Sequence, residues 1–195
     1  MVKKIVITGG LGYIGSELCK IYSGVSWHHK ITVIDNRFIS ERVNQIRNWN
    51  MDFIHGDILD KHIINRYCKD ADVVHHLAGI TDVPRTKNQS NTDKDQNIRK
   101  VGEEGTQNIL NAISDKCKII FPSTHVVYEG IDGVKKDINE NEETKPVLSY
   151  SSSKATNEKQ LRDSGKNYVI LRLGSVYGYS TDTARIDIMP NLFSK

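Results

Sequence analysis

The sequence predicts a doubly wound α/β fold, in which a parallel sheet carries helices on both faces. Short apolar runs rich in Val and Ile alternate with stretches of helical periodicity along the chain. Apolar runs of this kind are typical of strands that are covered on both faces. The length of 195 residues, with 37% hydrophobic and 26% charged residues, suits one soluble globular domain.

Strands and helices are expected to alternate. The apolar runs predict strands at residues 4–7, 31–34, 52–54, 72–76, 118–121 and 168–173. The stretches of helical spacing predict helices at residues 13–22, 40–49, 61–68, 97–113 and 149–162. Two polar segments, 80–95 and 129–146, each follow a strand. They are therefore expected as loops over the carboxyl edge of the sheet, where open α/β sheets bind ligands.

Composition and charge exclude several functional classes. The 27 Lys and Arg against 24 Asp and Glu leave a net charge of only +3, so no nucleic-acid partner is expected. No apolar stretch approaches the roughly 20 residues of a membrane span, and no signal peptide is visible, so we expect a cytoplasmic protein without a membrane partner. The three cysteines are widely spaced, and adjacent histidines point apart on a strand, so no disulfide or metal site is expected.

A glycine turn between the first strand and the first helix is the strongest local signal. Gly10, Gly12 and Gly15 fit G-x-G-x-x-G, and Gly9 with the last two also fits G-x-x-G-x-x-G. Glycines allow the backbone to approach a pyrophosphate, whose charge the free N–H groups of the helix N-terminus attract. Asp35 ends the second strand about twenty residues later, where a carboxylate accepts hydrogen bonds from an adenosine ribose.

The residues near Asp35 bear on the type of dinucleotide. The carboxylate would repel a 2′-phosphate and so favours NAD over NADP, whereas the guanidinium of Arg37 could hold such a phosphate. The alternative interpretation is a glycine turn beside an ordinary surface aspartate. The order of strand, turn, helix and acid favours the dinucleotide site.

A second group of polar side chains is predicted at the same edge. Tyr150 and Lys154 are spaced i and i+4, so they share one face of a helix. A nearby ammonium favours phenolate and lowers the pKa of a tyrosine from about 10, which suits Tyr150 to accept a proton near neutral pH. Ser123 and Thr124 follow the fifth predicted strand and offer hydroxyls for a substrate oxygen.

Taken in order, the motifs of this chain resemble the extended short-chain dehydrogenase/reductases. More narrowly, they are similar to the NAD-dependent epimerase/dehydratase family, which acts on nucleotide sugars. The resemblance rests on Thr8–Gly15 (TGGLGYIG), Asp35-Asn36, Gly56-Asp57-Ile58, His76-Leu77-Ala78-Gly79, Ser123-Thr124, Val127-Tyr128, Tyr150-x-x-x-Lys154 and Leu171–Gly178 (LRLGSVYG).

The resemblance implies a Rossmann domain over residues 1–195 that binds NAD, with most of the family's C-terminal substrate-binding region absent. It implies cofactor contacts from Gly9, Gly12, Tyr13, Ile14, Gly15, Asp35, Asn36, Asp57, Ile58, Leu77, Ala78, Gly79, Tyr150 and Lys154. It implies a catalytic triad of Thr124, Tyr150 and Lys154, in which Thr124 is preferred to Ser123 because it lies four residues before Tyr128. Substrate contacts are expected from Thr81, Ser123, Thr124, His125 and Ser175.

The chemistry implied is that of an NAD-dependent nucleotide-sugar epimerase, in which Tyr150 takes the proton of a sugar hydroxyl while its carbon gives up a hydride. A nucleotide-sugar reductase or dehydrogenase that uses exchangeable NAD(P)H is one alternative. A non-catalytic dinucleotide-binding module is the other, because the chain is expected to be a fragment or a natural short form. The resemblance also implies a possible homodimer through a four-helix contact of the helices at 97–113 and 149–162.

Five positions depart from the family pattern. Dehydratases of the family usually follow the catalytic threonine with Asp-Glu, but here His125 and Val126 stand there, which disfavours 4,6-dehydration; Val126 also stands where decarboxylases usually have Glu. Thr81 replaces a lysine that is usual in UDP-galactose 4-epimerases. Gly102 and Ser175 stand where the family often has asparagine near the cofactor and near the substrate diphosphate.

Overall fold

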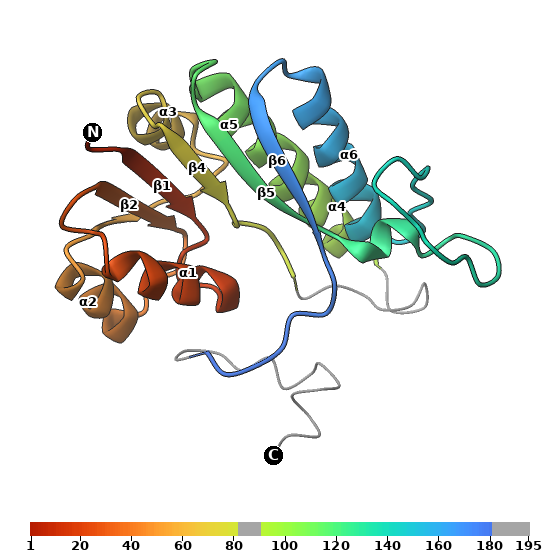
Figure 1. Ribbon diagram of the computed structural model, residues 1–195, viewed down its shortest axis with the longest axis horizontal. Coiled ribbons are helices and arrows are strands. Elements are labelled where there is room, and N and C mark those ends of the chain that lie inside the picture. The colour runs from red at the N-terminus through yellow and green to blue at the C-terminus, as the bar shows by residue number, and fades with distance from the viewer. Residues whose placement is uncertain (82–90, 181–195) are drawn as a thin grey trace.

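A computed structural model describes residues 1–81 and 91–180 of the chain. Six strands form one parallel sheet in the order β3-β2-β1-β4-β5-β6 (Figure 1). The strands are β1 (Lys4–Thr8), β2 (Lys30–Asp35), β3 (Asp52–His55), β4 (Val73–His76), β5 (Lys118–Thr124) and β6 (Asn167–Leu173). The predicted doubly wound α/β fold is confirmed, and the strand order reverses between β1 and β4, where such sheets bind ligands.

Helices cover both faces of the sheet. They are α1 (Tyr13–Ser23), α2 (Ser40–Asn48), α3 (Lys61–Cys68), α4 (Thr92–Arg99), α5 (Gly105–Ala112) and α6 (Ser149–Asp163). A π-helical turn, Lys100–Glu104, joins α4 to α5, and a 3-10 turn, His125–Tyr128, follows β5. None of the helices in the described ranges is long and apolar enough to cross a membrane.

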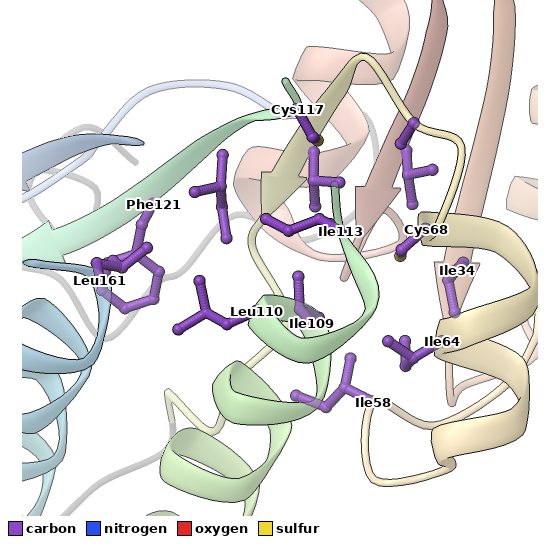
Figure 2. Packing of buried hydrophobic residues seen from close by; sticks show 14 residues of the cluster. Ile34, Ile58, Ile64, Cys68, Ile109, Leu110, Ile113, Cys117, Phe121 and Leu161 are labelled. Carbon is purple, nitrogen blue, oxygen red and sulfur yellow. The ribbon is translucent and has the colours of Figure 1, made fainter. Parts of the chain in front are cut away.

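Two hydrophobic clusters hold the layers together, because side chains alternate between the faces of each strand. On one face, Ile5 and Ile7 of β1 pack with buried residues of α1 and α2. On the other, Val6 belongs to a cluster that α3, α5 and α6 cover. Figure 2 shows this second cluster, with Ile109 at its centre and Phe121 beside Leu161. Ile5 and Ile7 therefore face the layer of α1 and α2, and Val6 faces the layer of α3, α5 and α6.

β5 is longer than predicted and reaches Thr124 through Pro122. A proline in a central strand normally costs a ladder hydrogen bond, because it has no N–H. The pairing of β4 with β5 extends only to Ile120, so beyond that point β5 has a partner only on the β6 side. This one-sided end accommodates the proline and carries Ser123 and Thr124 past the end of β4.

The helix before β5 begins earlier than predicted, at Thr92, so the expectation of a loop over residues 80–95 is wrong for its last part. Asn91 caps the helix by accepting a hydrogen bond from the backbone N–H of Lys94 at 2.8 Å. Residues 82–90 of that segment lie outside the described residues. The cap is a local signal that helical periodicity alone does not detect, because the first turn is almost wholly polar.

The packing of the second hydrophobic cluster can be tested with the variant Ile109→Ala on α5. Ile109 is fully buried, so the loss of its methyl and methylene groups should lower the free energy of unfolding by about 2–5 kcal/mol, measured by urea denaturation. The control is Ile21→Ala on α1, where the side chain is 74% exposed and the change should stay within about 0.5 kcal/mol. Equal losses in the two variants would contradict the packing described.

Candidate active site

The glycine turn connects β1 to α1 with little room for side chains. A Cβ at Gly15 would lie 2.3 Å from the carbonyl oxygen of Gly9, and Gly9 itself has a φ of +71° and approaches the backbone of Ala78. The turn is therefore packed against the end of β4. Gly12 caps α1 without a side-chain hydrogen bond, and the first turn of α1, which includes Tyr13 and Ile14, holds no acidic residue. This helix end can accept a phosphate.

Asp35, at the end of β2, is buried beside this turn. Its Oδ2 accepts a hydrogen bond from the backbone N–H of Leu11 at 2.9 Å, and its Oδ1 accepts from the backbone N–H of Arg37 at 3.0 Å. The guanidinium of Arg37 forms an ion pair with the same carboxylate, with Nε and Oδ1 3.4 Å apart. Oδ1 accepts both of the bonds from Arg37, whereas Oδ2 accepts one bond and has further acceptor capacity, so Asp35 can both hold the glycine turn and accept a ribose hydroxyl through Oδ2.

Asn36 and Asp57 meet next to Asp35. The side-chain amide of Asn36 donates to Asp57 Oδ2 at 3.0 Å, and the other oxygen of Asp57 accepts from the backbone N–H of Leu59 at 2.8 Å. Ile58, between them, points its side chain into the core, where a Cβ at Gly105 would lie 2.3 Å from it. The side chain of Ile58 therefore packs in the core, and its carbonyl oxygen accepts a hydrogen bond from Asn108 Nδ2 at 3.1 Å, so the cofactor contact of Ile58 stays a prediction.

A buried histidine joins β1, β4 and α5 below the glycine turn. One ring nitrogen of His76 lies 3.0 Å from Thr8 Oγ1 and the other lies 3.0 Å from Thr106 Oγ1. Burial, and to a lesser degree the positive charge of Lys154, lower the pKa of His76 to about 3, so the ring is neutral. The backbone N–H of Ala78 donates to Thr8 Oγ1, so the same threonine also holds the start of the segment after β4. Leu77 and Ala78 are partly buried and Gly79 is exposed.

The end of β5 and the first turns of α6 bring the predicted catalytic residues to the carboxyl edge. Thr124 is the last residue of β5, and its Oγ1 accepts from the backbone N–H of Val126 at 3.3 Å. Lys154 Nζ lies 5.9 Å from the ring centroid of Tyr150, one helical turn earlier. It donates to the carbonyl oxygen of Pro122 at 2.8 Å and lies 4.3 Å from the ring centroid of Phe121. Lys154 thus spans from α6 to the strand that carries Thr124.

The surroundings of Lys154 change its acidity. Burial lowers the pKa of its amine to about 8, and the negative charge of Glu158 opposes part of that shift. An amine with this pKa exchanges protons close to neutral pH, which is the range where a proton-transfer group is useful.

The carboxylate of Glu129 holds the start of α6. Its Oε1 accepts from the backbone N–H groups of Val147 and Leu148, each at 2.7 Å, and from the hydroxyl of Ser151. A negative charge at a helix N-terminus is favourable, because it satisfies free N–H groups and complements the helix dipole. Glu129 thereby orients the helical turn that carries Tyr150, and nothing in the local sequence pattern singled it out.

The remaining predicted substrate residues differ in their positions. Thr81, His125 and Ser175 are exposed, and His125 Nδ1 lies 3.2 Å from the carbonyl oxygen of Leu173. Ser123 is buried and donates to Glu158 Oε1 at 2.6 Å. The hydroxyl of Ser123 is therefore directed toward Glu158, whereas Thr124, which is also buried, is the last residue of β5.

Sequence reasoning missed Glu158 and Arg172, which form a buried ion pair with 2.7 Å between Nη2 and Oε2. A signal was present in the sequence. Arg172 interrupts the apolar run of β6, and a charged residue in a strand of this kind needs a buried partner. Glu158 lies four residues after Lys154 on the same helix face.

Comparison with known proteins gives one family. The model of the NAD dependent epimerase/dehydratase family matches residues 5–194. The chain is 36% identical to UDP-N-acetyl-alpha-D-glucosaminuronate decarboxylase of Bacillus cytotoxicus over 130 residues, which are 66% of this chain and 38% of the relative. It is 31% identical to dTDP-D-glucose 4,6-dehydratase of Dictyostelium discoideum over 198 aligned positions, which cover 91% of this chain and 44% of the relative.

A solved structure has the same fold. It is that of UDP-glucuronic acid 4-epimerase from Bacillus cereus in complex with UDP-glucuronic acid and NAD, and the match has a TM-score of 0.76 with 28% sequence identity. The alignment covers 96% of this chain and 60% of that chain. The chain thus spans roughly half the length of the relatives that it matches.

The acidity of Lys154 can be measured directly. Competitive acylation of the folded chain, read by mass spectrometry of the peptide that contains Lys154, should give a midpoint near pH 8, against about 10.4 for an unperturbed lysine. Unfolding in urea should return the midpoint to the unperturbed value, because the cause is burial. A folded chain that already shows the unperturbed midpoint would contradict the geometry around Lys154.

Proposed function

The chain belongs to the NAD dependent epimerase/dehydratase family, and from this premise we propose that it is the NAD-binding part of a nucleotide-sugar epimerase. In this proposal Tyr150 removes the proton of a sugar hydroxyl, Lys154 supports the resulting phenolate, and Thr124 binds the reacting oxygen. The nicotinamide of bound NAD supplies the hydride acceptor and donor.

One observation carries the proposal. The glycine turn after β1 and the Tyr150–Lys154 pair on α6 lie at the same carboxyl edge of the sheet, on either side of the point where the strand order reverses. A dinucleotide that binds with its pyrophosphate at the glycine turn can direct its nicotinamide toward Thr124. The predicted cofactor site and the predicted catalytic pair come from separate parts of the sequence, and both lie at the carboxyl edge of the sheet.

The residues present fit NAD. The lack of a Cβ at Gly9 and Gly15 allows the turn to close tightly at the end of β1, and the end of α1 there offers free N–H groups to a pyrophosphate. Asp35 retains acceptor capacity for ribose hydroxyls, and its charge opposes a 2′-phosphate. Arg37 is already paired with that carboxylate, which reduces its availability for such a phosphate. Leu77, Ala78 and Gly79 would line the path between the turn and Lys154.

Each of the three catalytic residues has a defined task. Lys154 is held by the carbonyl of Pro122, and its other N–H groups remain available to a ribose and to the electrostatic support of Tyr150. The hydroxyl of Thr124 accepts from Val126 N–H and can still donate its own proton to a substrate oxygen. Tyr150 is then the group that accepts and returns the substrate proton.

The residues after Thr124 favour epimerisation over water loss. Known relatives include a dehydratase and a decarboxylase, so family membership alone does not select the reaction. Dehydratases of the family usually have Asp-Glu at the two positions after the catalytic threonine, as the acid and base for loss of water. This chain has His125 and Val126 there, and Val126 has no group that can transfer a proton. Epimerisation needs only the proton acceptor and the hydride carrier, which the proposed site supplies.

Substrate contacts are proposed for Thr81, His125 and Ser175, which are exposed and follow β4, β5 and β6 in the chain. Ser123 is left out, because its hydroxyl donates to Glu158. A homodimer through a four-helix contact of the helices at residues 97–113 and 149–162, and a cytoplasmic location, remain predictions.

The identity of the dinucleotide can be tested without any substrate. The chain is purified without added nucleotide and denatured, and the released compound is identified by mass spectrometry. Retained NAD is expected, because Asp35 disfavours a 2′-phosphate. Released NADP would instead favour the reductase alternative and a role for Arg37, and an empty site would be followed by titration with NAD.

Tyr150→Phe tests the reaction. The loss of the phenolic hydroxyl should lower the turnover of nucleotide sugars by at least about 10²-fold, because the proton acceptor is removed, while the affinity for NAD is retained. The matched control is Tyr168→Phe, at the start of β6 and the opposite edge of the sheet, which should keep full turnover.

Two results would contradict the proposal. One is a Tyr150→Phe variant with unchanged turnover. The other is a wild-type chain that binds NAD but converts none of a panel of nucleotide sugars, which would favour the non-catalytic dinucleotide-binding module. Absorbance of reduced nicotinamide that accumulates during turnover would favour the reductase or dehydrogenase.

A further inference from the structure

The carboxylate of Glu158 is fully buried behind the candidate catalytic residues and accepts hydrogen bonds from three side chains. Ser123 Oγ donates to Oε1 at 2.6 Å. Arg172 donates to both oxygens, with Nε 3.0 Å from Oε1 and Nη2 2.7 Å from Oε2. Arg162 Nη2 donates to Oε2 at 2.6 Å. Burial alone would raise the pKa of Glu158, but these hydrogen bonds lower it, so the group is ionised.

The donors come from three different elements. Ser123 belongs to β5 and directly precedes Thr124, Arg172 belongs to β6, and Arg162 belongs to α6, as Glu158 itself does. Glu158 also lies one helical turn after Lys154. One carboxylate therefore fixes the strand end that carries Thr124 against the helix that carries Lys154. Figure 1 shows α6 lying along β5 and β6, which brings these side chains together.

The network continues toward the loop at residues 129–146. Arg172 Nη1 donates to the hydroxyl of Tyr128 and to the carbonyl oxygen of Glu140, the latter at 3.2 Å. The hydroxyl of Tyr128 in turn donates to the carbonyl oxygen of Asn139 at 3.1 Å. The end of β5, the base of this loop and the middle of α6 are thus held by one hydrogen-bonded set around Glu158.

The charges around Lys154 give Glu158 a second effect. The amine of Lys154 faces the carbonyl of Pro122 and the ring of Phe121, which belong to β5. On α6 it faces Tyr150 and Glu158. β4 presents the neutral ring of His76. The negative charge that opposes the loss of the lysine proton comes from Glu158. Without it, the guanidinium groups of Arg162 and Arg172 would be left as unbalanced positive charges on the same side.

We propose that Glu158 is a positioning residue of the candidate active site, which fixes Thr124 relative to Lys154 and whose negative charge favours the protonated form of the lysine. This inference rests on the proposed function, because it assigns Thr124 and Lys154 to one reaction centre. Glu158 touches neither substrate nor cofactor in this assignment and acts through Ser123, Arg172 and Lys154.

Ser123→Ala tests the positioning effect with the mildest change. It removes the bond between β5 and Glu158 and leaves the ion pairs of Glu158 in place. Turnover should fall about tenfold with unchanged KM and unchanged NAD affinity, because a small displacement of catalytic groups lowers the rate of the chemical step and not binding. The matched control is Ser164→Ala at the other end of α6, where the hydroxyl donates to the carbonyl of Leu161, and turnover should be retained.

Glu158→Gln tests the charge. The amide keeps the shape of the side chain but removes its negative charge, so the Lys154 midpoint in competitive acylation should move below its wild-type value. Ser123→Ala keeps the charge and should leave that midpoint in place. Thermal unfolding of all variants shows whether each one is folded at the temperature of the assays.

The turnover rate and the Lys154 midpoint in competitive acylation together separate the outcomes. If Ser123→Ala turns over substrate at the wild-type rate, or if folded Glu158→Gln keeps the wild-type Lys154 midpoint, the inference is overturned and the network only stabilises the fold. If Glu158→Gln does not fold, the rate of Ser123→Ala decides. If the wild-type chain binds NAD but converts no nucleotide sugar, the proposed function fails, and the Lys154 midpoint of Glu158→Gln still decides whether the charge effect is real.

Discussion

The carboxyl edge of the sheet, where the candidate active site lies, depends on one steric constraint. This constraint is the close packing of the glycine turn against the ends of β1 and β4. A side chain at Gly9 or Gly15 would collide with backbone atoms, so the turn can close only because these positions lack a Cβ. Its closure places the N-terminus of α1 at the carboxyl edge of the sheet and brings the segment after β4 beside it. Asp35 holds the same turn, because its carboxylate accepts a hydrogen bond from the backbone N–H of Leu11.

Polar side chains then hold the rest of the edge in place. The buried His76 ties β4 to β1 and α5, and the buried Glu158 joins α6 to β5 and β6. The exposed Glu129 fixes the start of α6. Within residues 1–81 and 91–180, no buried side-chain nitrogen or oxygen lacks a hydrogen-bond partner. Such satisfied networks favour a single geometry, because any displacement would leave a polar group desolvated and unpaired. A site that orients a substrate for proton and hydride transfer requires that rigidity.

Much of the fold was predictable because its signals are local. The strand pattern of Ile5, Val6 and Ile7, the glycine spacing and the i, i+4 pair of Tyr150 and Lys154 each involve neighbouring residues or one helical turn. The start of α4 was missed because its first turn is polar and its signal is the cap by Asn91. The end of β5 was missed because Pro122 suggests a strand end, whereas the shorter β4 lets the strand continue past the proline.

The sequence by itself determined the fold class and the positions of the glycine turn, of Asp35 at the end of its strand, and of Tyr150 and Lys154 on one helix face, because each of these follows from spacing along the chain. Only the tertiary structure decided which of the two hydroxyls, that of Ser123 or that of Thr124, binds Glu158. It also decided that Glu158 accepts hydrogen bonds from both Ser123 and Arg172. These partners are 35 and 14 residues away from Glu158 in the chain. Their pairing follows from the packing of α6 on β5 and β6, which no periodicity within a single segment encodes.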